Sequence, residues 1–426
     1  MNEIEKNVKR VKESSLLLSS FSNEIRQELL FRLAKGLEER KEYLFSENKK
    51  DIEMAKMAGI KESVLHRLYF TEEKLESCIS GLEQLATLPD PLNKTLEKRE
   101  LDDDLVLEKV TVPIGVIGMI FEARPDAMIQ IIGLSIRTGN GIILKGGKEA
   151  RHSNEAILRV VQETLDGAPY IMLLSTHEDV DAILKMDKDI DLLIPRGSNA
   201  FVRYVMDNTH IPVLGHADGI CSIYVDKDVD IEKAVPVVFD SKTQYPAACN
   251  AAETLIVHDA IAPTFLPVMV QKFKENGVEM VGDEKVCSIV DIPQGKEEDF
   301  HKEFLDLKIA IMIVSSIDEA ICHINTYGSH HTDAIMTEDK IARDRFFRFV
   351  DSADVFCNAS TRFADGFRFG LGAEVGISTS KIHARGPVGL SGLTTTKWLL
   401  FGNGDIVATY SGKDARQFKH KDLLNA

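Results

Sequence analysis

The chain has 426 residues, with 51 lysines and arginines against 67 aspartates and glutamates, which gives a net charge of −16. This excess of acid excludes nucleic acid as the main partner, because neutralising phosphates requires a basic surface; it leaves room for one small basic pocket. Hydrophobic residues at 44% and charged residues at 28% exclude wholesale disorder. The length predicts two or three domains.

The first twelve residues carry charges throughout, and no window approaches the ~18 consecutive apolar residues of a membrane span. We therefore expect neither a signal peptide nor a membrane span. Six scattered cysteines without a CxxC pair predict a reducing, cytoplasmic location and no zinc site. His330 and His331 lack the spacing of a metal motif, so we interpret them as loop residues and expect no bound metal.

Residues 1–90 are predicted to be helical, since Ile25, Leu29, Leu33 and Leu37 repeat every four residues among charged ones. The segment 101–112 has the pattern of a hairpin that could form an exposed arm.

From residue 112 onward, short apolar runs alternate with helical stretches. The expected strands lie at 116–120, 142–144, 171–174, 192–194, 223–225, 254–257, 311–314 and 334–336. Strands that are apolar on both faces and alternate with helices are typical of parallel sheets covered on both sides. Two such series predict two α/β domains.

Cys249 lies among small residues in the segment 244–254, just before an expected buried strand. Small neighbours leave room for a carbonyl group to approach the sulfur, and nearby backbone N–H groups could stabilise an oxyanion. A buried structural cysteine is the alternative that these residues leave open.

Two loops that join a strand to a helix, 143–150 and 195–199, suit an anionic ligand. Glycines there allow close approach to the backbone, and the helix N-termini and lysines attract phosphate. Neither loop contains a P-loop or GxGxxG fingerprint, so each alone could be an ordinary turn, while the pair favours a nucleotide site. The residues expected to bind it are Lys145, Gly147, Lys148, Gly197 and Ser198.

Three arginines are further anion candidates. Arg124 follows a strand end and precedes a helix, while Arg362 and Arg385 lie in glycine-rich stretches too long for idle loops. Each could clamp a carboxylate or phosphate, or simply form a surface ion pair.

Six strings in the chain resemble those of the γ-glutamyl phosphate reductases (glutamate-5-semialdehyde dehydrogenases), a family of the aldehyde dehydrogenase superfamily. They are residues 113–118, 121–126, 214–221, 245–250, 358–362 and 383–389. The likeness extends to about residue 412 and implies an α/β fold with a Rossmann-like cofactor domain, a catalytic domain and a β-arm.

The resemblance divides the chain into three parts. Residues 1–100 and 113–220 would bind NADPH, residues 221–392 would form the catalytic domain, and residues 101–112 and 393–426 would form an oligomerisation arm. It implies a homodimer or homotetramer and leaves open a transient contact with glutamate 5-kinase.

The same resemblance implies the chemistry. Cys249 would attack L-glutamyl 5-phosphate to form a thioester, which NADPH then reduces to L-glutamate 5-semialdehyde in the second step of proline biosynthesis from glutamate. The implied substrate-binding residues are Arg124, Asn250, Arg362 and Arg385. Glu303 aligns with the glutamate that holds the nicotinamide ribose.

Three positions depart from the wider superfamily. Gly215 stands where hydrolytic members carry a glutamate base, so water is poorly activated and phosphate can be the exchanging group. Lys148 stands where NAD-dependent members carry a glutamate, and its charge favours a 2′-phosphate and thus NADPH. Ala123 replaces the oxyanion-hole asparagine, so backbone N–H groups must supply most of that hole.

Two rival functions remain at this stage. An acylating aldehyde dehydrogenase that uses coenzyme A or another semialdehyde is the nearest. A catalytically silent scaffold on the same fold is disfavoured by the cysteine and its small neighbours.

Overall fold

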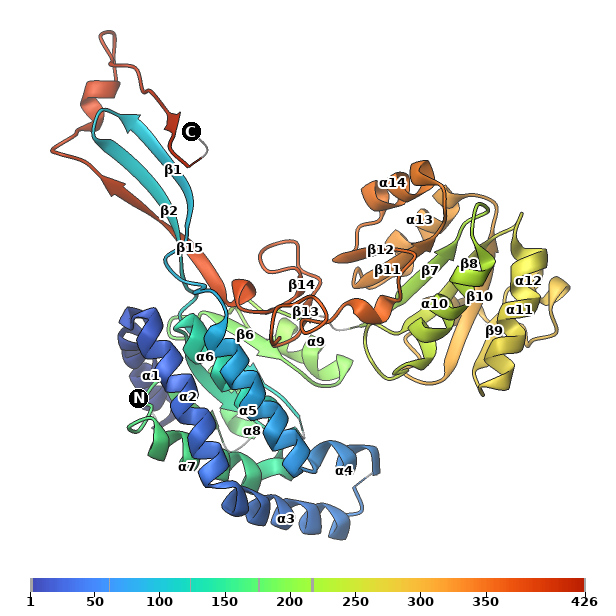
Figure 1. Ribbon diagram of the computed structural model, residues 1–426, viewed down its shortest axis with the longest axis horizontal. Helices are drawn as coiled ribbons and strands as arrows, with labels where there is room; N and C mark the ends of the chain where they lie inside the picture. The colour runs from blue at the N-terminus through green and yellow to red at the C-terminus, as the bar shows by residue number, and fades with distance from the viewer. Residues whose placement is uncertain (1–2, 61, 123, 175–176, 216–217, 425–426) are drawn as a thin grey trace.

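The computed structural model describes residues 3–60, 62–122, 124–174, 177–215 and 218–424. Two α/β units and a projecting arm are visible in Figure 1. No described helix is long and apolar enough to cross a membrane.

The N-terminal helices cover the first unit. They are α1 (Glu3–Ser20), α2 (Asn23–Glu39), α3 (Lys41–Met57), α4 (Glu62–Leu68) and α5 (Glu72–Thr87). The predicted amphipathic stripe is confirmed on α2, where Leu33 and Leu37 are fully buried and Leu29 is 8% exposed. Ile25 is 43% exposed, because it lies in the first turn, where Ser22 caps the helix.

The first sheet has four parallel strands in the order β5-β4-β3-β6. Its strands are β3 (Val116–Ile120), β4 (Gly141–Lys145), β5 (Ile171–Leu174) and β6 (Leu192–Pro195). Its helices are α6 (Pro125–Thr138), α7 (Arg151–Thr164), α8 (His177–Ile183) and α9 (Asn199–Asp207), with the 3-10 turn η1 (Lys148–Ala150) before α7.

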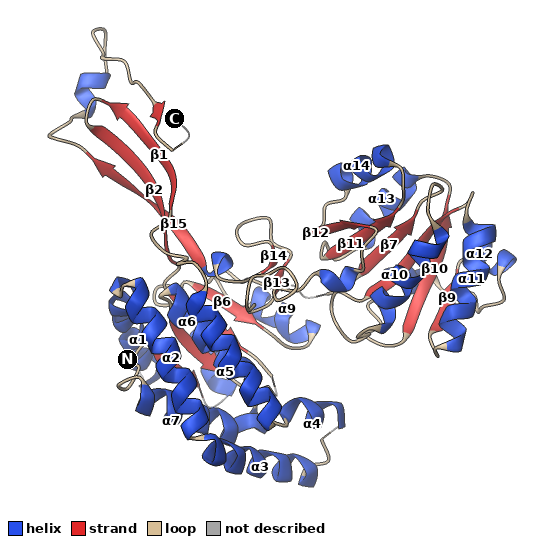
Figure 2. Cartoon of the chain, viewed as in Figure 1, coloured by secondary structure: helices blue, strands red, loops and turns tan. Residues whose placement is uncertain are grey.

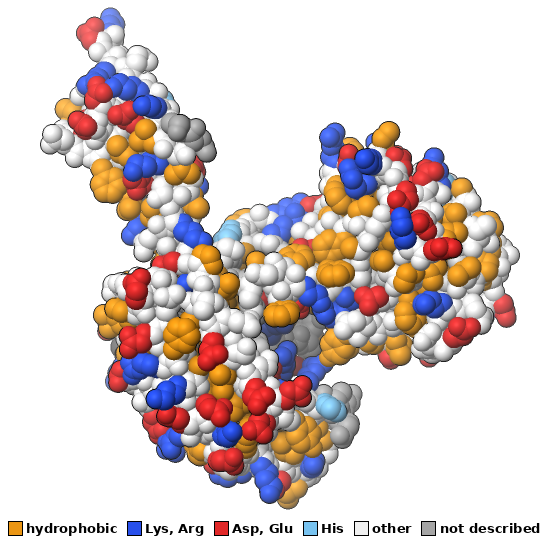
Figure 3. Space-filling view, in the orientation of Figure 1, with side chains coloured by type: hydrophobic (Ala, Val, Ile, Leu, Met, Phe, Trp, Pro, Cys, Tyr) orange, Lys and Arg blue, Asp and Glu red, His pale blue; other side chains and the backbone are white. Residues whose placement is uncertain are grey.

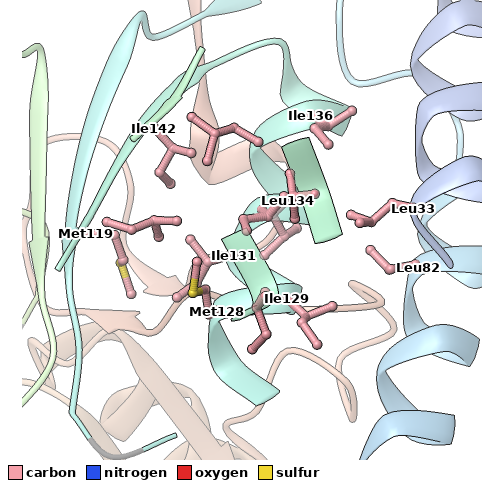
Figure 4. Packing of buried hydrophobic residues seen from close by; sticks show 14 of the residues in the cluster. Leu33, Leu82, Met119, Met128, Ile129, Ile131, Leu134, Ile136 and Ile142 are labelled. Atoms are coloured by element: carbon pink, nitrogen blue, oxygen red, sulfur yellow. The ribbon is translucent and has the colours of Figure 1, made fainter. Parts of the chain in front are cut away.

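Helix α6 is the centre of this unit's core. Figure 4 shows its side chains between the sheet residues Met119 and Ile142 and the helix residues Leu33 and Leu82. Leu134 of α6 is fully buried, and a side chain of this kind contributes about 1.5–3 kcal/mol by leaving water. The carboxyl ends of β4 and β6 are thereby held on a rigid base.

The second sheet has six parallel strands in the order β12-β11-β7-β8-β10-β9. The strands are β7 (Cys221–Val225), β8 (Ala252–His258), β9 (Glu279–Gly282), β10 (Lys308–Val314), β11 (Thr332–Met336) and β12 (Asp354–Cys357). The helices are α10 (Ile231–Thr243), α11 (Ala262–Glu275), α12 (Glu284–Ile289), α13 (Ile317–Tyr327) and α14 (Lys340–Phe349), with the 3-10 turn η2 (Glu297–His301). Both predicted parallel sheets are therefore confirmed.

The arm is an antiparallel sheet in the order β15-β2-β1-β16. Its strands are β1 (Thr95–Asp102), β2 (Leu105–Pro113), β15 (Thr394–Phe401) and β16 (Lys421–Asp422), and the turn η5 (Val407–Tyr410) lies between the last two. The hairpin begins earlier than the predicted residue 101, because β1 is largely charged and shows no apolar pattern. Figure 2 shows how far these strands project from the two α/β units.

The chain between β12 and β15 contains only short elements: η3 (Thr361–Phe363), β13 (Ile377–Ser378), β14 (Gly386–Pro387) and η4 (Ser391–Leu393). Strands β13 and β14 pair with each other. This glycine-rich passage links the second unit to the arm and borders the site described next.

Candidate active site

Cys249 lies in the loop that connects α10 to β8. The side chain is half-buried, and the loop's turn is closed by bonds from Ala248 N to Tyr245 O and from Ala251 N to Ala248 O. Within the described residues, the backbone N–H groups of Cys249 and Asn250 donate to no acceptor. Two free N–H groups beside a nucleophile are suited to an oxyanion.

His331 is the residue that lowers the pKa of this thiol most. It immediately precedes β11 and is fully buried, and its charge lowers the pKa of the Cys249 thiol. His330 and His331 do lie in a loop, as predicted, but the sequence interpretation missed the interaction with Cys249. The local sequence around His331 could not indicate this interaction, because it joins the start of β11 to the Cys249 loop, which is distant in the chain.

Burial raises the pKa of the Cys249 thiol, but other groups outweigh this effect. The charges of His331 and Arg196 lower the pKa below the usual thiol value, while Glu303 opposes them. A lowered pKa increases the thiolate fraction at neutral pH, and the thiolate is the nucleophile.

The loop before β7 lies directly against the Cys249 backbone. A Cβ atom at Gly219 would lie 2.3 Å from the carbonyl oxygen of Cys249 and 2.6 Å from Oε1 of Glu303, so only glycine fits. Gly219 N donates to Glu303 Oε1 at 3.0 Å, and Asn199 Nδ2 donates to Glu303 Oε2 at 2.7 Å. Glu303 therefore ties the N-terminus of α9 to the loop beside the nucleophile.

Two arginines from different parts of the chain act on Cys249. Arg196, at the end of β6, lies against Gly376, where a Cβ atom would come within 2.4 Å of its Nη1. The Arg362 Nε donates to Gln244 Oε1 at 2.8 Å, and its charge interacts with that of Cys249. Within the described residues, Arg196 forms no close salt bridge, although its charge also acts on Glu374. It was not among the predicted site residues, although it lies in the predicted loop 195–199.

The other predicted substrate residues have partners of their own. Asn250 Nδ2 donates to Ala364 O at 2.7 Å, which anchors the nucleophile loop. Arg124 pairs with Asp126 at 2.6 Å. Arg385 pairs with Asp351 at 3.0 Å, and no described contact brings it to Cys249. Ala123, expected near the oxyanion hole, lies outside the described residues.

The predicted nucleotide loop follows β4 and contains the 3-10 turn η1. Lys145 is 4% exposed and donates to Gly146 O; burial lowers its pKa against the opposing charges of Glu149 and Asp179. Lys148 is exposed and borders a hollow. The hollow is lined by Gly146, Gly147, Lys148, Arg151, Asn154, Glu155, Leu173 and Leu174.

Two observations fit this hollow to a nucleotide. It lies at the N-terminal end of α7, where the positive end of the helix dipole favours an anion, while the N–H groups of His152 and Ser153 donate to Asp51 at 3.0 and 2.7 Å. The Oδ1 atom of Asn154 is buried and finds no hydrogen-bond partner in the described part of the chain, and a ligand hydroxyl could supply one.

The second predicted loop, 195–199, lies beside β3. Ser198 caps α9 by accepting from Phe201 N at 3.4 Å, as expected of an N-cap. Gly197 lies between the carboxyl group of Glu122 and the Phe201 ring. Since β6 neighbours β3 and β3 neighbours β4, both loops lie at the same edge of the sheet.

Comparisons with known proteins agree with this architecture. The model of the aldehyde dehydrogenase family matches residues 1–294. A protein of Pelotomaculum thermopropionicum named gamma-glutamyl phosphate reductase is 50% identical over 99% of this chain and 98% of its own length. The protein of the same name from Synechococcus elongatus is 53% identical over 95% of both chains. The crystal structure of gamma-glutamyl phosphate reductase from Thermotoga maritima has a TM-score of 0.93 at 38% identity, covering 95% of this chain and 100% of that one.

Proposed function

Because the chain belongs to the aldehyde dehydrogenase family and, within it, to the gamma-glutamyl phosphate reductases, we propose that it reduces L-glutamyl 5-phosphate to L-glutamate 5-semialdehyde and phosphate. This reaction is the second step of proline biosynthesis from glutamate. The observation that carries the proposal is Cys249, a half-buried thiol of lowered pKa in a loop of small residues, near two arginines.

The first half of the reaction uses the chain's own residues. The sulfur of Cys249 attacks the acyl carbon, a C–S bond forms, and the C–O bond to phosphate breaks with its electron pair leaving on phosphate. The free N–H groups of Cys249 and Asn250 stabilise the oxyanion. Arg196 and Arg362 supply positive charge for the departing phosphate.

The resulting thioester must survive until it is reduced. Gly215 provides no carboxylate to activate water, so hydrolysis is slow. A nicotinamide cofactor supplies the hydride when bound. Breaking of the C–S bond then frees the semialdehyde and restores Cys249.

We propose NADPH as the reduced cofactor. Lys145, Gly147, Lys148, Gly197 and Ser198 would hold it in the two loops at the edge of the first sheet, and Glu303 would hold the nicotinamide ribose. The fit rests on the hollow at the N-terminal end of α7 and on the buried, unpartnered Oδ1 of Asn154. The exposed charge of Lys148 supports a 2′-phosphate at that hollow.

The direct test is a reverse-direction assay with NADP⁺, phosphate and pyrroline-5-carboxylate, the cyclised form of the semialdehyde. We expect phosphate-dependent reduction of NADP⁺ and none when coenzyme A replaces phosphate. Reduction with coenzyme A and not phosphate would favour the rival acylating dehydrogenase.

Replacing Cys249 by Ala or Ser should lower the turnover number by at least about 10³-fold, because the covalent route is lost. Binding of NADPH, followed by fluorescence titration, should stay measurable. Substantial residual turnover in Cys249→Ala would remove Cys249 from the mechanism.

Three further proposals concern partners, substrate groups and location. The arm would join copies of the chain into a homodimer or homotetramer, and glutamate 5-kinase would make a transient contact to hand over its product. Arg124 and Arg385 would contact substrate after giving up their present ion pairs. We place the enzyme in the cytoplasm, where its scattered cysteines would stay reduced.

A further inference from the structure

A row of three side chains leads from Cys249 to the edge strand β12. The segment that contains His331 lies beside Cys249, because Ser329 Oγ accepts from Ile220 N at 2.8 Å and Cys221 Sγ donates to Cys249 O at 3.3 Å. The charge of His331 acts on the thiol, its Nδ1 lies 2.8 Å from Thr332 Oγ1, and Thr332 Oγ1 donates to Asp354 Oδ2 at 3.4 Å. The order is thiol, imidazole, hydroxyl and carboxyl.

The row is buried and fixed by the sheet. His331 and Thr332 are fully buried and Asp354 is 8% exposed. Thr332 and Asp354 are partners in the parallel pairing of β11 with β12, and Asp354 N also donates to His331 O at 3.0 Å. Asp354 thus holds the histidine segment by both its backbone and its side chain, so the ring cannot turn freely.

The direction of the hydrogen bonds decides which nitrogen faces the sulfur. Because the Thr332 hydroxyl gives its hydrogen to Asp354, its oxygen can only accept from Nδ1–H. The neutral ring then presents the lone pair of Nε2 for the thiol proton. A nucleophile, a histidine and a group that orients the histidine form the arrangement that activates thiols and hydroxyls in unrelated enzymes.

We propose that His331 is the catalytic base for Cys249 and that Thr332 and Asp354 are the positioning residues that hold its tautomer. The proton passes from Sγ to Nε2, the freed electron pair on sulfur forms the C–S bond, and the imidazolium then gives the proton to the departing phosphate. This inference rests on the proposed function only in taking Cys249 as the nucleophile.

Several other charged groups face this row and must be held constant in a test. Arg196, Arg362 and Glu303 act on Cys249, and Cys221 donates through its Sγ to Cys249 O at 3.3 Å. Arg385 acts on Asp354. Asp333, next to Thr332, is engaged by Ser222 N at 2.6 Å and Ser352 Oγ at 2.5 Å.

The experiment measures the rate at which iodoacetamide alkylates Cys249 between pH 5 and pH 10, read by mass spectrometry of the Cys249 peptide. It compares the full-length parent chain with His331→Gln and Thr332→Val. The matched control is His330→Gln, a neighbouring loop histidine whose Nδ1 contacts Asp351 O at 2.7 Å. Alkylation needs no substrate, so its outcome is independent of the reductase assay.

In the parent, the half-maximal rate should fall below pH 8.5, about the value of an ordinary thiol. In His331→Gln, the pH of the half-maximal rate should rise by at least about one unit, because burial raises the thiol pKa and His331 no longer lowers it. The alkylation rate at pH 7 should fall at least about tenfold. Thr332→Val should shift the profile in the same direction by less, and His330→Gln should not shift it.

An unchanged profile in His331→Gln would overturn the proposal, as would an equal shift in His330→Gln. If His331→Gln does not fold, Thr332→Val decides. Its folding is checked by circular dichroism, and a parent-like profile in the folded variant would then refute the relay.

Discussion

A thiol buried in a protein of net charge −16 would ordinarily stay protonated, because both burial and surrounding acid disfavour a thiolate. At Cys249, a nearby imidazole and a nearby arginine lower the thiol pKa instead. Cys221, one strand away and fully buried, shows the ordinary outcome, since burial and Asp333 raise its pKa well above the usual value. Reactivity at this site is therefore a property of individual neighbours.

Lys148 is the residue on which the choice of cofactor should depend. Lys148→Glu would place a negative charge where the 2′-phosphate is proposed to lie, and we expect the ratio of kcat/KM for NADPH over NADH to fall by about tenfold or more. Steady-state kinetics with both cofactors measure this ratio. Lys227→Glu, in an exposed turn after β7, is the charge-matched control, and an equal fall there would refute the assignment.

The element that positions Cys249 is the loop between α10 and β8, and a buried ion pair closes it. Lys242, in the last turn of α10, meets Glu253 of β8 at 2.6 Å, with both side chains fully buried. Glu253 Oε1 also accepts from Leu305 N at 3.3 Å, two residues after Glu303. The pair therefore holds together the nucleophile loop and the segment proposed to bind the ribose.

Breaking this pair should be costly. Lys242→Met should lower the free energy of unfolding by roughly 3–5 kcal/mol, because an uncompensated carboxyl group is left buried. Burial already raises the pKa of Glu253 to about 7 against the opposing effect of Lys242. When folding raises the pKa of a buried carboxyl group, the folded protein loses stability as pH rises through that pKa. The loss of unfolding free energy in Lys242→Met should therefore be larger at pH 8.5 than at pH 5.5.

Urea denaturation at the two pH values checks this expectation. Lys233→Met removes a surface pair with Glu338, 3.1 Å apart and more than half exposed at Lys233, and should cost much less, because water screens the pair. The double variant Lys242→Met/Glu253→Leu should recover most of the lost stability. A defect in Lys242→Met no larger than that of the surface variant would contradict the account.

Elements with a strong apolar pattern could be predicted from the sequence, and those without one could not. Eight of the ten strands in the two parallel sheets are confirmed, because burial on two faces produces continuous apolar runs. The charged strand β1 and the two edge strands of the second sheet, β9 and β12, were missed, since partial exposure removes that pattern. Cys249 could be proposed from its small neighbours, whereas His331 and Arg196 could not, because their contacts join distant parts of the chain.

At the scale of the whole molecule, the arm has an unprotected edge. Strand β15 pairs only with β2 among the described residues, and Trp398, Leu400 and Phe401 on it are each at least half exposed. Figure 3 shows hydrophobic side chains gathered on the arm. A long apolar edge strand is a template for pairing with another chain, which supports the proposed oligomer.

We expect Leu400→Asp to shift the chain towards the monomer, because it places a charge in the proposed contact between arms. Sedimentation velocity measures the distribution of species. Ile341→Asp, at an 80% exposed position on α14, is the matched control. If both variants sediment like the parent, self-association through β15 is refuted.

The contact of Glu303 with Gly219 and Asn199 has a consequence for how cofactor binding should be understood. If Glu303 holds the ribose as proposed, each hydroxyl meets a carboxylate that already has two donors, so binding is an exchange of partners rather than an addition. The donor released first would be the side chain of Asn199, at the start of α9. Cofactor binding would then break the Asn199–Glu303 hydrogen bond, one of the contacts between the two α/β units. The measured affinity would include the free-energy cost of breaking it.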